Sequence, residues 1–179
     1  RQPELKDIHK GEALFLRAWM YYKLWNTYGS AAPLVTERIM ELDNAYPPSS
    51  QETELLDQAI ADLAEAATLL PDSWNDSNKG RVTKNSAYAL RGKILVFRGT
   101  VAGNSGDFSE ALNDFNAISG ASLMPNYGDN FNAEMENNEE SFFEYQANDQ
   151  SNLTNPFLDN DGFAVVGDIS SYYGMFTKQ

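Results

Sequence analysis

Hydrophobic residues recur at steps of three and four positions in four stretches of the chain, and this period predicts four helices. The first helix is expected from Glu4 to about Tyr28, after Pro3, which suits a first helical turn. The second is expected over Gln51–Leu70 and ends before Pro71. The first helix carries two apolar stripes, so we expect it to be buried on two sides. Its second stripe consists of Ala13, Leu16, Met20 and Leu24.

The third helix is expected within Gly80–Gly99 and should be long and mostly buried. Thr83 or Asn85 can cap its start, and Gly99 can end it by adopting the left-handed conformation. Gly92 lies in the middle of this helix, where glycine costs about 0.5–1 kcal/mol relative to alanine. Close approach of another helix at Gly92 is the expected compensation. The fourth helix is expected over Asp107–Gly120.

Two of these helices begin with the spacing of a capping box, in which an N-cap side chain and an acidic residue three positions later satisfy free backbone N–H groups. The pairs are Ser49 with Glu52 and Asp107 with Glu110. We therefore expect these residues to cap the second and fourth helices.

The helical period is lost beyond residue 120. Ser141–Gln146 is short and aromatic, which favours a β-strand, and the remainder is rich in Asn, Asp and Gly and should form loops. The predicted fold is mainly α, in one domain over residues 1–179. About four long helices form tetratricopeptide-like hairpins over residues 1–120, and a loop-rich part with a short β element follows over residues 121–179. The helices should form two antiparallel pairs stacked through Gly92.

The charge balance is strongly acidic, with 26 Asp and Glu against 13 Lys and Arg and a net charge of −13. This charge repels phosphates, so nucleic acid binding is not expected. The chain has no cysteine and a single histidine, His9, so thiolate metal sites, zinc sites and a serine triad lack their residues. We predict no metal and no cofactor. No apolar run reaches the length of a membrane span.

Two arginines, Arg17 and Arg81, lie among apolar residues. A guanidinium offers five donors in a fixed geometry, which suits pairing with carboxylates or with the last carbonyls of a helix. We therefore expect both arginines to be structural.

Five blocks of residues follow one another between about residue 10 and residue 146. They are Gly11–Trp19 with Tyr22, Leu24, Tyr28, Gly29 and Pro33–Val35; Asp62, Leu63, Ala66, Leu70 and Pro71; Gly80–Lys84 with Ala87, Ala89 and Leu90; Phe108, Ala111 and Leu112; and Glu140 with Phe142, Phe143 and Gln146. In order and spacing, these blocks resemble the SusD/RagB family.

The resemblance implies a surface-exposed outer-membrane lipoprotein of Bacteroidetes. Such a protein captures an oligosaccharide or polysaccharide and caps a SusC-like TonB-dependent transporter in a nutrient-uptake system, without catalysis. The family's N-terminal lipobox cysteine is absent here, and members of the family continue well beyond Gln179. We therefore expect this chain to be a fragment, attached to the membrane only through a lipid anchor outside it.

Aromatic side chains among amides and carboxylates are the best candidates for a sugar site. The C–H faces of sugars stack on flat rings, while their hydroxyl groups bond to polar side chains. The candidates with this setting are Trp74, Phe157, Tyr172 and Tyr173. The alternative for each ring is that it packs beneath a loop.

Two other functions remain open from the sequence. A helical-repeat scaffold that binds only protein would need the same helices and no sugar site. A glycosidase would need two carboxylates about 5–10 Å apart, although solvation explains the available carboxylates more simply. Those carboxylates are Asp129, Glu139, Glu140, Asp159 and Asp161.

Overall fold

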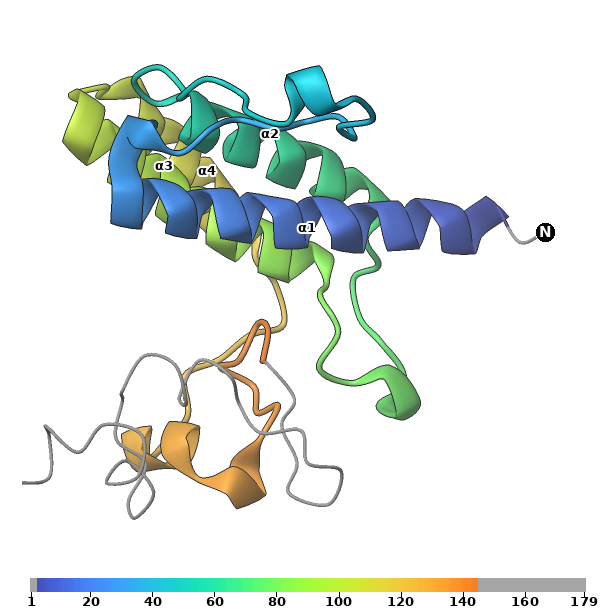
Figure 1. The fold of residues 1–179 in the computed structure, drawn as a ribbon. Helices are drawn as coiled ribbons and strands as arrows, with labels where there is room; N and C mark the ends of the chain where they lie inside the picture. Colours follow the sequence, from blue (N-terminus) through green and yellow to red (C-terminus); the bar gives the residue numbers. More distant parts are fainter. Residues whose placement is uncertain (1–2, 145–179) are drawn as a thin grey trace, which may run out of the picture. The chain divides into compact units, whose positions relative to one another are not determined.

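The computed structural model describes residues 3–144, and over this range the chain forms four α-helices (Figure 1). They are α1 (Pro3–Tyr28), α2 (Glu54–Leu69), α3 (Lys84–Ala102) and α4 (Gly106–Ala117). Short 3-10 helices lie in the connections, at Gly29–Ala31, Leu42–Asn44, Asp76–Asn78, Tyr127–Phe131 and Ala133–Met135. The predicted strand is not found from Ser141 to Glu144, and its last two residues lie outside the described range.

The helices belong to a compact unit that ends at Phe143. Residues from Glu144 onward make up a second unit, of which the structure describes Glu144 alone. The organisation of residues 1–179 as one domain stays a prediction. Over the described range, none of the helices combines the length and the apolar character that crossing a membrane requires.

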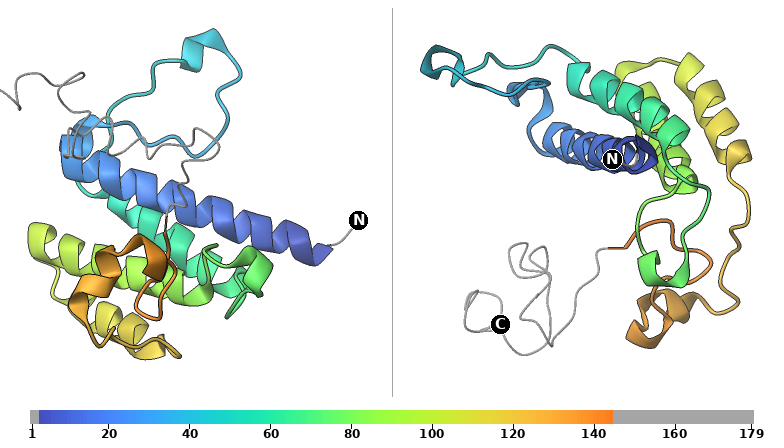
Figure 2. Two further views of the ribbon diagram at one scale, coloured as in Figure 1. Left: turned by 90° about the horizontal axis from the view of Figure 1, so that it is seen from below. Right: turned by 90° about the vertical axis from the view of Figure 1, so that its right-hand side faces the viewer.

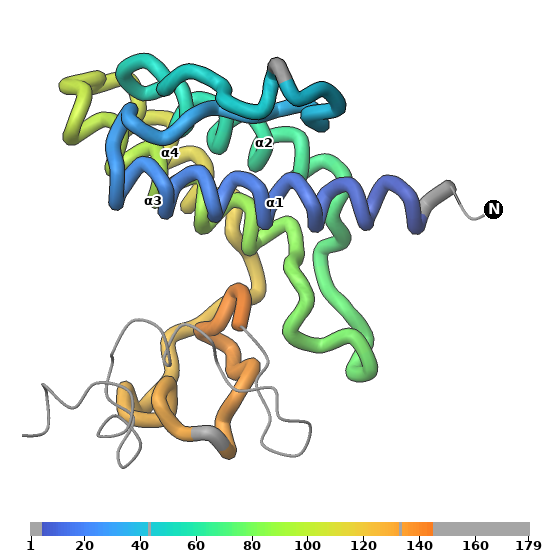
Figure 3. Tube along the Cα trace, viewed as in Figure 1, coloured from blue at the N-terminus to red at the C-terminus, as the bar shows by residue number. Residues whose placement is uncertain are grey.

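The helices pair as two antiparallel hairpins, α1 with α2 and α3 with α4 (Figures 1 and 3). The hairpins stack through α2 and α3, whereas α1 and α3 meet at only a few positions. Figure 2 shows this stacking in a view along α1. The prediction of a mainly α fold built from tetratricopeptide-like hairpins is confirmed.

The core is centred on α2, because this helix is packed on two sides. Leu55, Leu56 and Leu63 have no exposed surface. In α1, Phe15 is buried, but Leu16 and Met20 are 45% and 50% exposed. The expectation that α1 is buried on two sides is therefore wrong within the described residues, since only Leu24 of the second stripe packs against the core.

Glycines of α3 are packed against phenylalanine rings of α4. The ring of Phe115 lies against Gly92, and the ring of Phe108 lies against Gly99 seven residues later. The expected place of Gly92 between the two hairpins is wrong, because its close contact lies inside the second hairpin. Gly99 does not end α3 either. The helix continues to Ala102, and Gly103, with φ of 69°, adopts the left-handed conformation that ends it.

Ion pairs repeat at the same interval of seven residues. The Nε and Nη2 atoms of Arg98 donate to both oxygens of Asp107 at 2.7 Å, and Arg98 also reaches Asp57 of α2 at 2.8 Å. These hydrogen bonds, chiefly the one with Asp107, raise the pKa of Arg98. Arg91 bonds to Asp114 at 3.1 Å, but Arg91 Nε and Asp114 Oδ2 are buried without a partner among the described residues. The Arg98–Asp107 pair, near the turn, therefore has more of its polar atoms hydrogen-bonded than the Arg91–Asp114 pair at the far end of the hairpin.

The start of α3 follows the sequence pattern. The Thr83 side chain accepts a hydrogen bond from the backbone N–H of Ser86, and the Ser86 hydroxyl accepts one from the backbone N–H of Thr83. These reciprocal bonds satisfy free N–H groups of the first turn. Thr83 is thus the cap, and not Asn85.

The two expected capping boxes are wrong. Helix α2 begins at Glu54, whose own carboxylate accepts the backbone N–H of Gln51 at 2.8 Å, so the pair of Ser49 and Glu52 is not used. Asp107 lies inside the first turn of α4, where it binds the guanidinium of Arg98 instead of a free N–H group. At α2 a neighbouring local hydrogen bond replaces the expected pair, whereas at α4 an ion pair with another helix does so.

Candidate functional site

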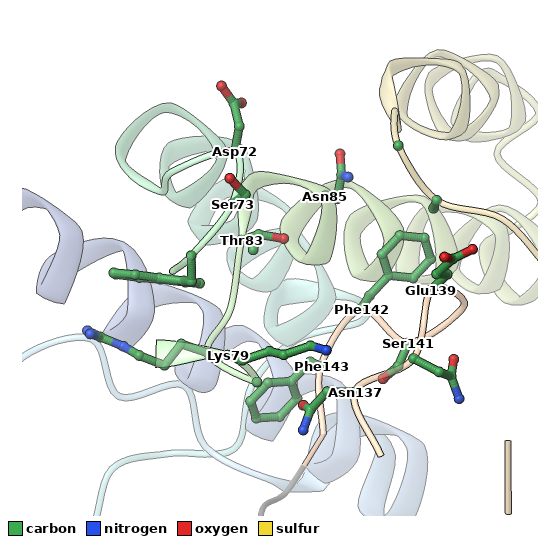
Figure 4. Close-up of a pocket in the computed structure, with 16 residues that line it drawn as sticks. Asp72, Ser73, Lys79, Thr83, Asn85, Asn137, Glu139, Ser141, Phe142 and Phe143 are labelled. Carbon is green, nitrogen blue, oxygen red and sulfur yellow. The ribbon is translucent and has the colours of Figure 1, made fainter. Parts of the chain in front are cut away.

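Two connecting segments form a cleft of about 300 Å³ at the start of α3. One wall comes from the loop between α2 and α3, and the other comes from the segment that follows α4. Figure 4 shows Asp72, Ser73 and Lys79 on the first wall and Glu139, Ser141 and Phe142 on the facing wall. Phe142 and Lys79 are 63 positions apart in the sequence, so the fold brings them together.

The first wall is fixed to the helices by hydrogen bonds and an ion pair. The indole N–H of Trp74 donates to the carbonyl of Val82 at 2.8 Å, and the guanidinium of Arg81 lies 4.0 Å from the centre of the Trp74 ring. Arg81 also binds Glu12 of α1 through two bonds, of 2.7 and 2.8 Å. This pairing, first of all its hydrogen bonds, raises the pKa of Arg81. Helix α1 therefore helps to fix the position of this loop, together with the Trp74–Val82 bond.

The second wall is fixed to the start of α3. Asn85 bonds to both backbone groups of Ser119, and the hydroxyl of Ser86 donates to the carbonyl of Phe142. The next residue, Phe143, packs edge-to-face on Phe15 of α1, with ring centroids 5.3 Å apart. The ring of Phe142 can thus face the cleft while its backbone is anchored to the helices.

Glu140 organises the loop behind this wall. Its carboxylate accepts the backbone N–H of Met124 and the side-chain amide of Asn130, both at 2.9 Å. These bonds lower the pKa of Glu140, with the Met124 N–H as the larger cause. A negative charge on Glu140 therefore stabilises the loop that carries the second wall.

The side chains that line the cleft offer groups to which a carbohydrate can bind. Phe142 offers a ring face, Ser73 and Ser141 offer hydroxyl groups, and Lys79 offers an ammonium group. Ring faces take the C–H surface of a sugar, and hydroxyl and ammonium groups bond to its oxygens. Among the described residues no group of three or more His, Asp or Glu side chains is arranged to hold a metal ion.

Only one of the four predicted sugar-binding aromatics lies in the described range. Trp74 lines the cleft and is half-buried, with its N–H bound to Val82 and one ring face covered by Arg81. Phe157, Tyr172 and Tyr173 lie outside the described residues. A sugar-binding role for Trp74 stays a prediction, and only the uncovered part of its ring can serve it.

The two predicted structural arginines both pair with carboxylates. Arg81 binds Glu12 through the two bonds that fix the first wall, and Arg17 of α1 donates to both oxygens of Asp62 of α2 at 2.7 Å. Asp62 is 3% exposed and Arg17 is 35% exposed, so the pair joins the two helices of the first hairpin with its carboxylate buried and its guanidinium partly in solvent. That their role is structural, and not ligand binding, stays a prediction.

The sequence does not identify Lys79, Ser141 and Phe142 as candidates for a binding site. The pattern around Ser141 and Phe142 favours a strand, and Lys79 is one polar residue in a polar loop. Sequence reasoning also passes over Tyr127 and Phe131, which are 74% and 76% exposed with ring centroids 5.3 Å apart. The pattern of an aromatic ring among amides would have found this pair, which lies within a run of Asn, Gly and Asp.

Comparison with known proteins identifies the family. The SusD-like family described as "Starch-binding associating with outer membrane" matches residues 1–96, more than half of the chain. No protein with a curated description matches.

Solved structures share the fold. A SusD-like protein from Bacteroides fragilis NCTC 9343 is 27% identical, with a TM-score of 0.71 over 82% of this chain and 28% of its own. A SusD superfamily protein from Bacteroides vulgatus ATCC 8482 is 28% identical, with a TM-score of 0.68 over 82% of this chain and 30% of its own. A laminarin-binding SusD-like protein is 28% identical, with a TM-score of 0.64 over 74% of this chain and 29% of its own.

The chain thus spans less than a third of the length of these relatives. The matching family is described by binding and by association with the outer membrane, and not by a reaction. The hairpins and the order of their elements are consistent with the family match. This chain belongs to the SusD-like family.

Proposed function

We propose that this protein is the glycan-binding component of a nutrient-uptake system at the cell surface. It captures an oligosaccharide or polysaccharide and delivers it to a SusC-like TonB-dependent transporter, and it catalyses no reaction. Its place is the outer membrane, with a lipid anchor that lies outside residues 1–179.

The observation that carries this proposal is the cleft at the start of α3. An aromatic ring, hydroxyl groups and an ammonium group converge there from two walls that are each tied to the helices. Preorganised walls lower the entropy lost on binding, which is what a flexible, strongly hydrated ligand such as a sugar requires. The laminarin-binding relative supports the same class of ligand.

Two contacts would hold the sugar. The ring of Phe142 would stack on a pyranose face, and the hydroxyls of Ser73 and Ser141 would bond to ring substituents. Trp74 would contribute the edge of its ring. Phe157, Tyr172 and Tyr173 remain candidates for additional contacts.

A second candidate function is a protein-binding scaffold, favoured by the uncovered stripe on α1. Leu5, Leu16 and Met20 are 45%, 45% and 50% exposed and lie on the side of α1 away from α2. An apolar stripe of this kind suits a protein partner more than a sugar. Such a partner is compatible with glycan capture, since the cleft does not include these residues.

The test is calorimetric titration of the full-length protein with laminarin and starch oligosaccharides. Phe142→Ala should weaken binding about fivefold, corresponding to an aromatic contact of about 1 kcal/mol. Tyr46→Ala is the matched control, because Tyr46 is 92% exposed and does not line the cleft. Binding that is unchanged by Phe142→Ala would place the sugar elsewhere, and turnover of the glycan would contradict a binding role.

A further inference from the structure

We propose that the ligand of the cleft carries an acidic group, a uronic acid carboxylate, and that Lys79 binds it. This inference rests on the proposed function and narrows the class of glycan. It starts from how the charged groups around the cleft are paired.

Lys79 differs from the other cations beside the cleft. Arg81 is bound to Glu12 by two hydrogen bonds, and Lys84 is bound to Asp72 at 2.7 Å. Lys79, in contrast, has no carboxylate within 4 Å in the described part of the chain. Its side chain extends from the first wall toward the segment with Phe142 and Ser141 (Figure 4).

Most of the other polar groups that line the cleft are already occupied. Asn85 bonds to Ser119, and the amide of Asn138 bonds to Asn130 and to the backbone N–H of Glu140. No hydrogen bond engages the Lys79 ammonium or the hydroxyls of Ser73 and Ser141 within the described residues. These three groups are therefore available to a ligand, and the ammonium is the one that selects for charge.

The net charge of −13 opposes an anionic ligand, but distance limits its effect. At physiological ionic strength the screening length is about 8 Å, so the charges next to the cleft decide the outcome. Asp72 and Glu12 are each neutralised by a partner, which leaves Glu139 on the facing wall, and Glu140 behind it, as the competing carboxylates. Glu139 accepts a hydrogen bond from Ser122 at 2.7 Å and pairs with no described cation.

The geometry therefore favours a sugar that places its carboxylate at Lys79 and its C–H face on Phe142. The carboxylate accepts from the ammonium, and the hydroxyls of Ser73 and Ser141 bond to the neighbouring oxygens. A charge-assisted hydrogen bond is shorter and stronger than a neutral one, so it gives preference for an acidic sugar over a neutral sugar of the same shape.

The experiment compares an acidic and a neutral ligand on the full-length protein. Oligogalacturonate and laminarin oligosaccharides are titrated into the wild type, Lys79→Met and Lys23→Met. Lys23 is an exposed lysine of α1 that does not line the cleft, so it controls for the loss of one positive charge. We expect Lys79→Met to weaken oligogalacturonate binding about fivefold, in the range of a solvent-accessible ion pair, and to leave laminarin binding unchanged.

Two further measurements sharpen the result. Glu139→Gln should strengthen oligogalacturonate binding, because it removes the carboxylate that competes with the ligand. Raising the salt concentration should weaken oligogalacturonate binding in the wild type and have less effect in Lys79→Met. Circular dichroism of each variant confirms that the helices are retained.

The possible outcomes separate this inference from the proposed function. If Lys79→Met weakens both ligands equally, or neither, the acidic-sugar inference is overturned while glycan binding stands. If a sulfated oligosaccharide binds through Lys79 and oligogalacturonate does not, the carboxylate assignment is overturned. If the wild type binds neither glycan, the proposed function fails together with the inference.

Discussion

The ring of Phe115 covers Gly92 so closely that a methyl group on Gly92 would lie 2.5 Å from the Cε1 atom of Phe115. A side chain at position 92 therefore requires the ring to move. Phe115 is 43% exposed, so the ring has room to move toward solvent, and the penalty grows with the size of the added side chain. The contact explains why a glycine is kept in the middle of α3 despite its low helix propensity.

The first prediction concerns this contact. Gly92→Leu should destabilise the protein by about 1–3 kcal/mol through overpacking, as measured by urea unfolding. Adding Phe115→Ala to Gly92→Leu should recover part of the loss, because the smaller side chain makes room for leucine. Val96→Leu, at a site on α3 that is 40% exposed, is the control and should have little effect. Strictly additive effects of the two substitutions would contradict the contact.

The second prediction concerns the pair across the first hairpin. Arg17→Ala leaves the carboxylate of Asp62 buried at 3% exposure with Gln58 as its remaining bonding partner. Loss of one partner of a buried pair is strongly destabilising, and since Arg17 itself is 35% exposed we expect about 2–4 kcal/mol. Arg38→Ala, at an exposed arginine, is the control. Equal unfolding midpoints for the two variants would contradict the prediction.

The third prediction concerns Arg81. Arg81→Ala should cost about 1–2 kcal/mol, less than Arg17→Ala, because Glu12 is 21% exposed and can be rehydrated. Arg81→Lys should restore only part of the stability, since lysine cannot form the two parallel bonds or the flat stack on Trp74. In the folded protein glycan affinity should stay close to that of the wild type, because the hydrogen bond from Trp74 to the carbonyl of Val82 still fixes the first wall. Normal thermal stability combined with lost binding would instead make Arg81 a ligand residue.

The fourth prediction concerns pH. The pKa of Glu140 is lowered in the folded protein, so its contribution to stability is complete above the ordinary glutamate range and is lost as pH falls through the lowered pKa. The segment behind the second wall should therefore lose order in acid, and glycan affinity should fall in the same pH window. Amide hydrogen exchange at Met124 reports this change directly.

Glu140→Gln provides the control for the pH experiment. The glutamine keeps an oxygen that can accept the N–H of Met124 but carries no charge, so it should remove the acid dependence of this segment. An unchanged pH profile in the variant would show that another group is responsible. Glu139→Gln, beside it in the sequence, should leave the exchange at Met124 as it is.

Periodicity is sufficient to predict the helices but not their ends. The predicted ranges overlap all four helices, because each core face repeats at three and four residues. The pattern places the end of α3 at Gly99 because glycine often terminates helices, yet Phe108 packs on Gly99 and the helix continues to Ala102. A glycine can serve either purpose, and tertiary packing decides which.

The cleft can be predicted only in part. Trp74 is found because it is a large ring in a polar loop, which is a local property of the sequence. Lys79 and Phe142 cannot be paired from the sequence, because their proximity depends on the bonds of Asn85 and Ser86 to the segment that follows α4. Nor does the sequence alone show that Arg81 is bound to Glu12 while Lys79 has no ion-pair partner in the described range.

The repeated pairing of α3 with α4 allows a second register of the hairpin that keeps part of its side-chain contacts. Sliding α4 by seven residues would bring Phe108 onto Gly92 and Asp107 to Arg91, so half of the contacts would form again. Such a slide displaces the helix ends by about 10 Å along the axis. The three residues between Ala102 and Gly106 can cover that distance only if terminal turns unwind. The length of this turn therefore selects one alignment, and lengthening it with flexible residues would allow the shifted hairpin to compete.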